Sequence, residues 1–414
     1  MELLSPAGNL EKLKYAYAFG ADAAYIGLKD FSLRVKADNF HNDEAAGIRD
    51  LKKDKKLYCA MNIYFHKDDI TRLESELDYI AEYPFDAFIV SDVGIVPLLR
   101  RRFPHAKLHL STQANCTNAE AARMYQDMGF SRIILGREVG LDEIAGIKAK
   151  NPALELEAFV HGAMCLAYSG RCFLSAWMAG RSGNHGGCAH SCRWEYRLLE
   201  EAKRPGEYFP VYEGENFTTI LSSRDLCMID HLADLKSAGI DAIKIEGRMK
   251  SLYYTAVVTR AYRKHLDALN GKLTVSASGN SAGKNFSSGI SADDLASYRA
   301  DLFRVSHREY CTGFYFGRGE VERPTETGYL TKDMFLGIIG KEVSDGVYEL
   351  DIRNQITAGM AIQYIGPDEP FIQDSNFTLL DENGASLQKA DHEYTVRIKP
   401  GVRVHSGYII RREA

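Results

Sequence analysis

The sequence lacks the features of an exported or membrane-spanning protein. Its start, MELLSPAGNL, has no basic stretch and no long apolar run, so we expect no signal peptide. The longest apolar stretch, FIVSDVGIVPLL, contains Asp92 and is too short to cross a bilayer. These absences predict a cytoplasmic protein with no membrane partner. In that reducing environment a framework of disulfides is not expected.

The sequence also lacks an excess of positive charge and several catalytic signatures. Its formal net charge is −5, so a nucleic acid would have to be held by a local patch. No G-x-G-x-x-G opens the first predicted helix, which argues against a dinucleotide-binding sheet. There is no H-E-x-x-H and no recognisable Ser/His/Asp order. The sequence therefore does not support a zinc metallopeptidase or a serine hydrolase.

Four similar phrases recur at irregular spacing, each with a glycine or proline before a short β-rich run: residues 20–27, 84–90, 129–135 and 239–245. Each phrase follows a segment with helical apolar periodicity. We therefore expect the glycine or proline to end a helix and the β-rich run to enter a parallel sheet. Irregular spacing indicates βα units and not a solenoid.

Nine candidate strands follow from this pattern: residues 3–5, 23–27, 57–64, 87–92, 107–112, 132–136, 156–162, 218–223 and 242–247. A (β/α)₈ barrel needs eight, so one strand should lie outside it, most naturally near the cysteines. The predicted fold class is α/β: a TIM-like (β/α)₈ barrel with an inserted Cys-rich loop, followed by a small antiparallel β-barrel. The predicted divisions are a barrel (1–270) that contains the Cys-rich segment (162–196), a helical or irregular connection (271–334) and a small β-barrel (335–414).

Four of the eight cysteines lie within 28 residues, in the pattern C-x₆-C-x₁₅-C-x₃-C: Cys165, Cys172, Cys188 and Cys192. Zinc sites normally use C-x₂₋₄-C in both halves, and only the second pair fits. Four thiolates would satisfy an iron–sulfur cluster. The spacing therefore favours such a cluster over structural zinc, with unligated core cysteines as a third interpretation.

Polar residues follow the predicted strands where barrel enzymes carry out their chemistry, at the carboxyl ends. His161 ends one strand, and it is either an acid–base group or a structural histidine. Arginines near other strand ends have the forked geometry that clamps carboxylates or phosphates. These are Arg34, Arg137, Arg224 and Arg248. For any single one of them, a structural ion pair is the alternative.

The region around the first two cysteines resembles the signature of the peptidase U32, or collagenase-like, family. The matching run is Glu157-x-Phe159-x₂-Gly162-Ala163-Met164-Cys165-x₄-Gly170-x-Cys172-x-Leu174-Ser175. Other stretches resemble one branch of that family, the prephenate-dependent tRNA uridine hydroxylases: ELLSPAG, GADAAYIG, SLRV, VHGAMCLAYSGRC, CRWEY, SSRDL and KIEGRMKS. The resemblance runs from residue 1 to about 320, and the terminal β-barrel is similar in kind but weaker in sequence.

The resemblance implies an enzyme that makes 5-hydroxyuridine at the wobble position of tRNA without molecular oxygen. Its hydroxyl donor would be prephenate, a dicarboxylate for which converging arginines are suited. The four clustered cysteines would hold a [4Fe–4S] cluster, with zinc as a substitute in an air-exposed preparation. We expect His161 and Glu246 to be catalytic, with Glu246 orienting Arg248, and no obligate protein partner.

Other members of the family leave alternatives open. Further branches hydroxylate ribosomal RNA or ubiquinone precursors. The competing class is a U32-type peptidase, in which a reactive Cys165 would need His161 to lower its pKa.

Two regions are candidates for binding RNA. The C-terminal unit ends in basic residues that predict contacts with phosphates: Arg397, Lys399, Arg403, Arg411 and Arg412. The helix predicted over 252–269 carries side chains that would stack on bases or meet phosphates: Tyr253, Tyr254, Arg260, Tyr262 and Arg263. An amphipathic helix that caps the barrel is the alternative for these tyrosines.

Overall fold

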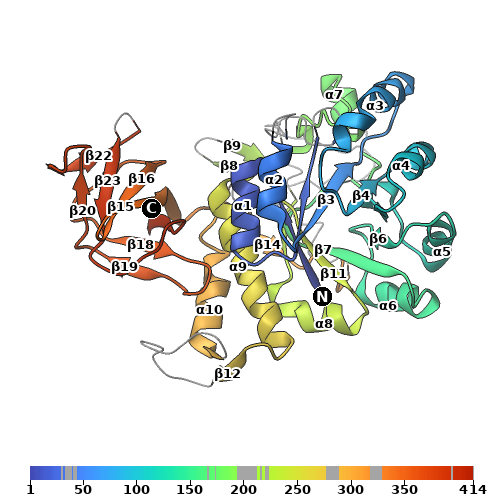
Figure 1. Ribbon diagram of the computed structural model, residues 1–414. Coiled ribbons are helices and arrows are strands. Elements are labelled where there is room, and N and C mark those ends of the chain that lie inside the picture. Colours follow the sequence, from blue (N-terminus) through green and yellow to red (C-terminus); the bar gives the residue numbers. More distant parts are fainter. Residues whose placement is uncertain are drawn as a thin grey trace. The chain divides into compact units, whose positions relative to one another are not determined.

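The computed structural model divides the chain into two compact units (Figure 1). Unit 1 comprises Met1–Leu269 and His307–Tyr329, and unit 2 comprises Asn270–Ser306 and Leu330–Ala414. The structure describes residues 1–28, 31–32, 40, 44–165, 167–172, 174–193, 212–214, 217–219, 223–276, 289–317, 329–392 and 395–413. The segment His307–Tyr329, which the sequence analysis left in the connection, thus belongs to unit 1.

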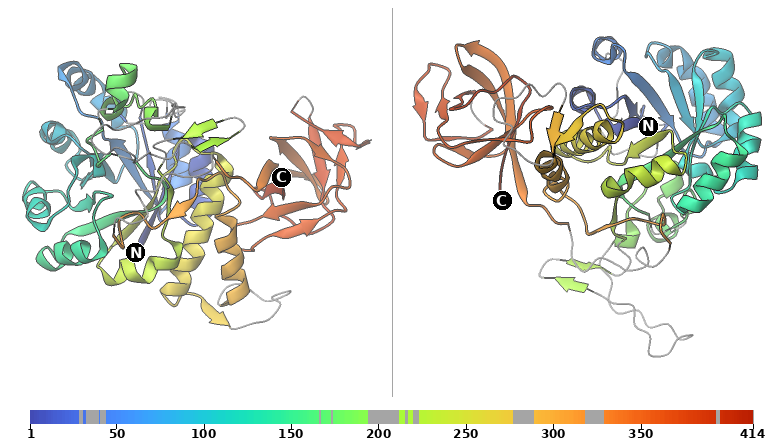
Figure 2. Two further views of the ribbon diagram at one scale, coloured as in Figure 1. Left: turned by 180° about the vertical axis from the view of Figure 1, so that it is seen from behind. Right: turned by 90° about the horizontal axis from the view of Figure 1, so that it is seen from below.

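Eight parallel strands close into a barrel in unit 1 (Figures 1 and 2). They are β1 (Glu2–Pro6), β2 (Ala23–Ile26), β3 (Lys56–Met61), β4 (Ala87–Val90), β5 (Lys107–Leu110), β6 (Arg132–Ile134), β7 (Glu155–Ala163) and β11 (Ala242–Ile245). Strand β11 pairs with both β1 and β7, and this double pairing closes the ring. The predicted (β/α)₈ barrel is confirmed.

Helices follow the strands and cover the outside of the barrel (Figure 2). They are α1 (Leu10–Ala18), α2 (Ala45–Lys52), α3 (Lys67–Ile80), α4 (Val96–Arg102), α5 (Ala119–Asp127), α6 (Leu141–Lys150), α8 (Leu232–Ser237) and α9 (Leu252–Leu269), with short 3₁₀ turns η1 (Val93–Ile95), η2 (Thr112–Ala114) and η5 (Ile229–His231). Among the described residues, no helix combines the length and the apolar character needed to span a membrane.

The predicted helix-to-strand transitions have the expected backbone. Gly20, Gly129 and Gly239 have φ angles of 104°, 88° and 93°, a left-handed conformation that ends helices and that glycine adopts without a Cβ clash. The strands that follow are buried on both faces, as in AAYI of β2 and AFIV of β4. Parallel strands covered by helices require this continuous apolar pattern.

Of the nine predicted strands, the one at 218–223 is not among the eight strands of the barrel. Residues 218 and 219 of that prediction belong to β9 (Phe217–Thr219), which forms an antiparallel pair with β8 (Tyr212–Gly214). Two short strands that the sequence analysis did not predict extend the barrel sheet instead. Strand β10 (Asp225–Cys227) runs antiparallel to β7, and β14 (Tyr310–Cys311) pairs with β10. Strands of two or three residues are too short to show a period of two in the sequence.

Unit 2 contains an antiparallel sheet of eight strands, in the order β19-β18-β24-β15-β16-β23-β20-β21. The strands are β15 (Asp333–Ser344), β16 (Val347–Ile352), β18 (Ile362–Ile365), β19 (Ile372–Asp374), β20 (Thr378–Leu380), β21 (Ser386–Leu387), β23 (Val396–Lys399) and β24 (Ile409–Glu413). The smaller elements are β12 (Thr274–Ser276), β13 (Gly289–Ser291), α10 (Ala292–Asp301), β17 (Ile356–Thr357) and β22 (Lys389–Ala390). Among the described residues the edge strands β19 and β21 do not pair with each other, so the predicted small β-barrel is a half-barrel.

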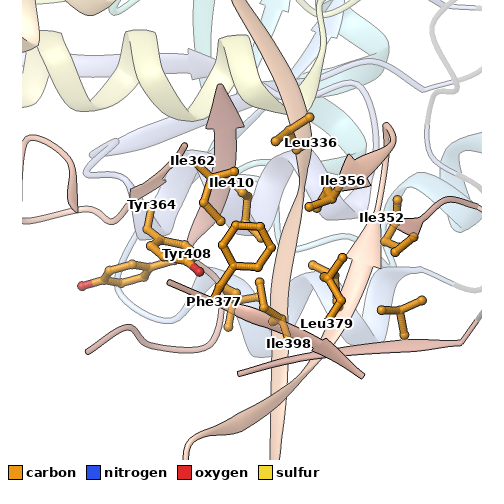
Figure 3. Packing of buried hydrophobic residues seen from close by; sticks show 14 of the residues in the cluster. Leu336, Ile352, Ile356, Ile362, Tyr364, Phe377, Leu379, Ile398, Tyr408 and Ile410 are labelled. Carbon is orange, nitrogen blue, oxygen red and sulfur yellow. The ribbon is translucent and has the colours of Figure 1, made fainter. Parts of the chain in front are cut away.

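The sheet of unit 2 curls around its own apolar core (Figure 3). Leu336, Tyr364, Leu379 and Ile398 are fully buried there, and Figure 3 shows their side chains gathered with Phe377. Apolar residues alternate along these strands and point inward. The same alternation in the sequence predicted short antiparallel strands.

One of the terminal cations is part of the interior of unit 2. Arg411 is fully buried, and its guanidinium lies 2.7 Å from an oxygen of Asp301 and 3.0 Å from one of Asp333. Its Nε also donates to Gln363 at 2.8 Å. The prediction that Arg411 contacts RNA phosphates is therefore wrong, because these carboxylates already occupy it. The corresponding expectation for the other terminal cations stays a prediction.

Candidate active site

The described residues of the Cys-rich segment (162–165, 167–172 and 174–193) contact loops at the carboxyl ends of the barrel strands. The hydroxyl of Tyr64, just after β3, lies within hydrogen-bond distance of the carbonyls of Gln113 (2.9 Å) and Gly170 (3.0 Å). Gly170 has a φ of 73°, and a Cβ there would lie 1.9 Å from the carbonyl oxygen of Gln113. Only glycine permits this approach, so the signature glycine sets the segment against the loop after β5.

Further contacts hold the same segment to neighbouring strand ends. The Ser169 N–H donates to the carboxylate of Glu138, and the Ser169 hydroxyl accepts from the Arg137 N–H at 3.2 Å. On the other side, a ring nitrogen of His185 lies 2.9 Å from an oxygen of Asp69 in α3. Figure 1 shows α7 (Leu174–Ala179), which belongs to this segment, at the same end of the barrel as α3.

The clustered cysteines differ in exposure from most of the others. Cys165 is exposed, and the remaining three of the cluster are partly exposed. In contrast, Cys59, Cys116 and Cys311 are buried. Burial raises the pKa of the Cys116 thiol to about 11 and raises that of Cys59 further, so both remain protonated at neutral pH. Thiols held in this way are poor metal ligands, because metal ions bind the thiolate.

The donor set suits an iron–sulfur cluster in its chemistry, since it offers four accessible thiols on one segment. Asn184, between the two cysteine pairs, donates to the Cys172 carbonyl at 3.1 Å, which links the turn η3 (Gly183–His185) to the second cysteine. Cys192 lies in the turn η4 (Ser191–Arg193). Within the described residues, no three His, Cys, Asp or Glu side chains are gathered closely enough to hold a metal ion. The ligand role of the four cysteines stays a prediction.

Arg137 connects the first cysteine with the barrel interior. Its Nη1 lies 3.9 Å from the sulfur of Cys165, and its guanidinium carbon lies 4.1 Å from the ring centroid of Phe159 on β7. The contact with the ring face is a cation–π interaction. Arg137 is half-buried, and its guanidinium lies beside Cys165. A small anion bound at this point would contact both the guanidinium and the thiol.

Arg248 lies at the barrel mouth, as its place after β11 predicts. It is buried, and its guanidinium donates to the hydroxyl of Ser32 and faces the ring of Tyr25 at 5.9 Å. A Cβ at Gly27 would lie 1.9 Å from Nη1 of Arg248. The absent side chain at Gly27 therefore makes the space that this arginine fills.

Lys244 is a third cation in this region, and the sequence analysis missed it. Its ammonium lies 3.2 Å from Glu157 and faces the rings of Tyr25 (4.2 Å) and Phe159 (5.6 Å). Burial lowers the pKa of Lys244, and the Glu157 carboxylate partly offsets that effect. The available signal was a single charged residue inside the otherwise apolar strand AIKI. Two aromatic rings thus link the three cations, with Phe159 between Arg137 and Lys244 and Tyr25 between Lys244 and Arg248.

His161 lies buried beneath this surface among tyrosines. Its Nδ1 is 3.4 Å from the Tyr262 hydroxyl and its Nε2 is 3.3 Å from the Tyr310 hydroxyl. The Tyr262 hydroxyl donates to the Val160 carbonyl, so its oxygen accepts a hydrogen bond from the Nδ1–H tautomer of His161, in which the Tyr310 hydroxyl donates to Nε2. Burial lowers the pKa of His161 to about 3, so the ring is neutral at pH 7. Its predicted catalytic role stays a prediction, and both of its ring nitrogens have tyrosine partners.

An ion pair that the sequence analysis did not assign borders the histidine. Arg308 donates to the carboxylate of Asp225 from Nη2 (2.6 Å), Nε (3.0 Å) and its backbone N–H (3.1 Å), and both residues are buried. The Arg308 guanidinium lowers the pKa of Asp225 although burial alone would raise it. The residue preceding Asp225 also has a partner, since Arg224 lies 3.3 Å from Glu309.

The two other predicted site residues have different outcomes. Glu246 lies between β11 and Arg248 and is half-buried, and its backbone N–H donates to the His161 carbonyl at 2.9 Å. Its backbone carbonyl accepts from Tyr254 at 2.9 Å. It therefore lies at the mouth, and its role stays a prediction. Arg34 lies outside the described residues.

Helix α9 is a structural helix of the barrel wall. Tyr253, Tyr254, Arg260 and Tyr262 are buried, and Arg263 forms ion pairs with Asp22 and Asp267. The hypothesis that these side chains stack on bases is wrong, because the tyrosines face the protein interior. The alternative, an amphipathic helix that covers the barrel, is confirmed.

Comparison with known proteins decides the family. Residues 8–325 match the sequence profile of peptidase family U32, and residues 332–411 match that of the peptidase family U32 C-terminal domain. The chain belongs to peptidase family U32. The resemblance inferred from the signature around Cys165 and Cys172 is thereby confirmed.

Two tRNA hydroxylation proteins are similar to this chain along most of their length, and an rRNA-modifying enzyme is similar over less than half of its own. The chain is 35% identical to tRNA hydroxylation protein P of Escherichia coli (strain K12), over 91% of this chain and 88% of the relative. It is 35% identical to tRNA hydroxylation protein P1 of Bacillus subtilis (strain 168), over 99% of this chain and 94% of the relative. The 23S rRNA 5-hydroxycytidine C2501 synthase of Escherichia coli is 35% identical over 67% of this chain and 42% of that protein.

Within this U32 barrel, the mouth combines accessible thiols with cations that face aromatic rings. In general, guanidinium forks suit carboxylates and thiolates suit metal clusters, so the residues at this mouth are of the types that such ligands require. Asp225 and Arg308 lie beside His161, where they stabilise the β10 and β14 extension of the sheet.

Proposed function

We propose that this chain is an RNA-modifying enzyme of the cytoplasm that hydroxylates the wobble uridine of tRNA to 5-hydroxyuridine. The observation that carries the proposal is the 35% identity to two proteins named for tRNA hydroxylation, along 88% and 94% of their lengths. Because the identity extends over both units, it supports a shared reaction and not a shared fold alone.

The proposed hydroxyl donor is prephenate. Its two carboxylates suit forked guanidinium groups, and Arg137 and Arg248 lie at the mouth on either side of Lys244. Hydroxylation replaces the C5–H bond of the uridine by a C–O bond, which oxidises the base. The donor exchanges its own C–O bond for a C–H bond and is reduced in return, so no molecular oxygen is consumed.

The proposed cofactor is a [4Fe–4S] cluster on the four clustered cysteines. A bound cluster would bind and activate the hydroxyl donor. The residues of this chain hold the segment over the mouth through Tyr64, Gly170 and Ser169, and Arg137 lies beside Cys165. That placement supports chemistry at the mouth, where a substrate on the cations would meet the thiols.

A Cys–His peptidase is the competing function, and the geometry does not favour it. In the part of the chain that the structure describes, the Cys165 thiol contacts Arg137, whereas the nitrogens of His161 contact two tyrosines. A Cys–His peptidase needs the histidine beside the thiol as its general base, and among the described residues the ring nitrogens of His161 contact tyrosines and not Cys165. The rRNA alternative has support from a relative of which this chain covers only 42%.

The test is mass spectrometry of nucleosides from a strain that lacks this gene. We expect 5-hydroxyuridine and its derivatives to disappear from tRNA while hydroxylated nucleosides of ribosomal RNA remain. Complementation with wild type should restore the signal, whereas Cys165→Ser should not, and Cys116→Ser serves as the matched control. Unchanged 5-hydroxyuridine in tRNA would overturn the proposed function.

A further inference from the structure

The Cys-rich segment exposes large aromatic side chains at the barrel mouth. Trp177 on α7 is 74% exposed and Tyr168 is 56% exposed. Burying an aromatic side chain is normally favourable, so an exposed pair on one segment needs a reason. In α9, by contrast, the tyrosines are in the interior. Trp177 is the most exposed aromatic side chain among the described residues, and it shares the Cys-rich segment with exposed Tyr168.

The same segment is locally basic. Residues 162–193 contain three arginines and two histidines but no aspartate or glutamate, in a chain whose net charge is −5. Arg171 and Arg181 are exposed, and neither forms an ion pair with a residue that the structure describes. A chain with a net charge of −5 can hold a nucleic acid only at a local basic patch, and this segment is a patch of that kind.

The placement of the patch relates it to the barrel mouth. Tyr168 is two residues from Gly170, which packs against the loop after β5, and Trp177 lies on the helix that follows Cys172. The segment also contacts the loop after β3, since the Tyr64 N–H donates to the Asn184 carbonyl at 3.2 Å. The exposed rings therefore belong to a segment that lies against the loops after β3 and β5, close to where a polymer would deliver one of its units to the mouth.

We propose that Trp177 and Tyr168 stack on unpaired bases of the RNA substrate, next to the base that enters the barrel mouth, while Arg171 and Arg181 contact the flanking phosphates. This inference rests on the proposed function and assigns its RNA-binding surface. An exposed aromatic ring stacks on any unpaired base, and guanidinium groups meet the backbone. A single-stranded loop fits this chemistry, because the bases of a duplex are already stacked.

The first experiment measures binding of a labelled tRNA anticodon stem–loop to the full-length protein by fluorescence anisotropy. Trp177→Ala should weaken binding by about 5- to 150-fold, the range for loss of one base–aromatic stack. Trp177→Phe should retain most of the affinity, because the ring remains. A fully paired RNA duplex should bind wild type and Trp177→Ala equally, since it offers no unpaired base.

Intrinsic fluorescence gives an independent readout of the same contact. The chain has two tryptophans, Trp177 and Trp194. We expect the stem–loop to quench the emission of the wild type, and we expect Trp177→Phe to remove most of that quenching. Quenching that persists in Trp177→Phe would assign it to Trp194 and would overturn the stacking role of Trp177.

Salt dependence separates the arginines from the aromatic residues. Arg181→Ala should lower the slope of log affinity against log salt concentration by about 0.7, the value for one phosphate contact on a single strand. Trp177→Ala should leave that slope unchanged, because stacking releases no counterions. Matched controls outside the segment are Phe316→Ala, which removes a ring that is 54% exposed, and Arg123→Ala on α5. Neither control should change binding.

Two negative results have different meanings. If the wild type binds the stem–loop and Trp177→Ala binds it equally well, the stacking surface is overturned while the proposed function stands. A protein partner would then be the better explanation for the exposed rings. If the wild type binds no stem–loop at any salt concentration, the proposed function fails together with this inference.

Discussion

The Cys-rich segment and unit 2 use their arginines in opposite ways. In unit 2, Arg411 is fully buried and lies between Asp301 and Asp333. In the Cys-rich segment, Arg181 is exposed on a stretch without a single carboxylate. A cation held by buried carboxylates stabilises the fold, whereas a cation left in solvent is available to a ligand.

The difference teaches that a basic residue in a sequence does not by itself indicate a nucleic-acid contact. The cluster of cations at the end of the chain predicted phosphate contacts, and the structure removes Arg411 from that set. The segment at the barrel mouth gave a weaker sequence signal, because its three arginines are spread over 23 residues (171–193). Whether neighbouring carboxylates occupy a cation decides its role, and the fold sets those neighbours.

The largest expected effect separates the two groups of cysteines. Replacing Cys165, Cys172, Cys188 or Cys192 by Ser should remove most of the iron and the visible absorption after anaerobic purification, since each would supply one of four ligands. Cys116→Ser should retain both, because that thiol is buried and its pKa is raised. Iron content measured per chain decides the outcome, and unchanged iron in all four variants would contradict the cluster.

The next largest effect concerns the buried arginine of unit 2. Arg411→Met would leave Asp301 buried without this partner, and breaking a buried ion pair in this way costs about 3–5 kcal/mol. Chemical denaturation should show that loss in the free energy of unfolding, with iron content unchanged. The control is Arg353→Met in the same unit, whose partner Asp351 is half-exposed, with an expected cost below about 1 kcal/mol. Equal effects of the two substitutions would show that burial of Arg411 is not what makes it important.

A smaller effect is expected at the barrel mouth. Arg248→Lys keeps a positive charge but loses the fork, so its apparent affinity for prephenate should fall by about 10- to 100-fold, as for loss of a charged hydrogen bond. The cluster spectrum and tRNA binding should remain intact. Arg102→Lys on α4 is a control away from the mouth. A lower melting temperature with unchanged affinity for prephenate would assign Arg248 to the stability of the rim.

The smallest expected effect, counted per pH unit, is a pH dependence of the free energy of unfolding. The pKa of His161 is about 3 in the folded protein against an ordinary value of 6.5, so the unfolded chain binds more protons between these values. The free energy of unfolding should therefore fall as pH falls from about 6.5 towards 3, by at most about 1.4 kcal/mol per pH unit from this residue. His161→Gln should flatten that slope in denaturation curves taken across the window. If the slope is unchanged in His161→Gln, groups other than His161 take up the protons on unfolding.

Much of the fold followed from local patterns. Glycines such as Gly20 and Gly239 ended helices before apolar runs, and this repetition predicted parallel strands with crossover helices. The strands β10 and β14 did not follow, because two or three residues carry no periodic signal. Their position depends on pairing between Asp225 and Tyr310, which are 85 residues apart in the sequence.

The candidate site was only partly predictable for the same reason. The chain order of Cys165, Arg137 and Arg248 relative to strands was enough to place them near the barrel mouth. Sequence proximity could not show that Phe159 lies between Arg137 and Lys244, or that Tyr262 and Tyr310 enclose His161. These neighbours come from different strands and helices, so only ring closure brings them together.

The sequence by itself determined the barrel, the family and the four clustered cysteines, because periodicity, helix-ending glycines and cysteine spacing are local properties. The tertiary structure decided which polar side chains remain available to a ligand. It buried the tyrosines of α9 and the guanidinium of Arg411, and it left Trp177 and Arg181 in solvent. Burial and ion pairing depend on residues that are distant in the chain, and no local pattern records them.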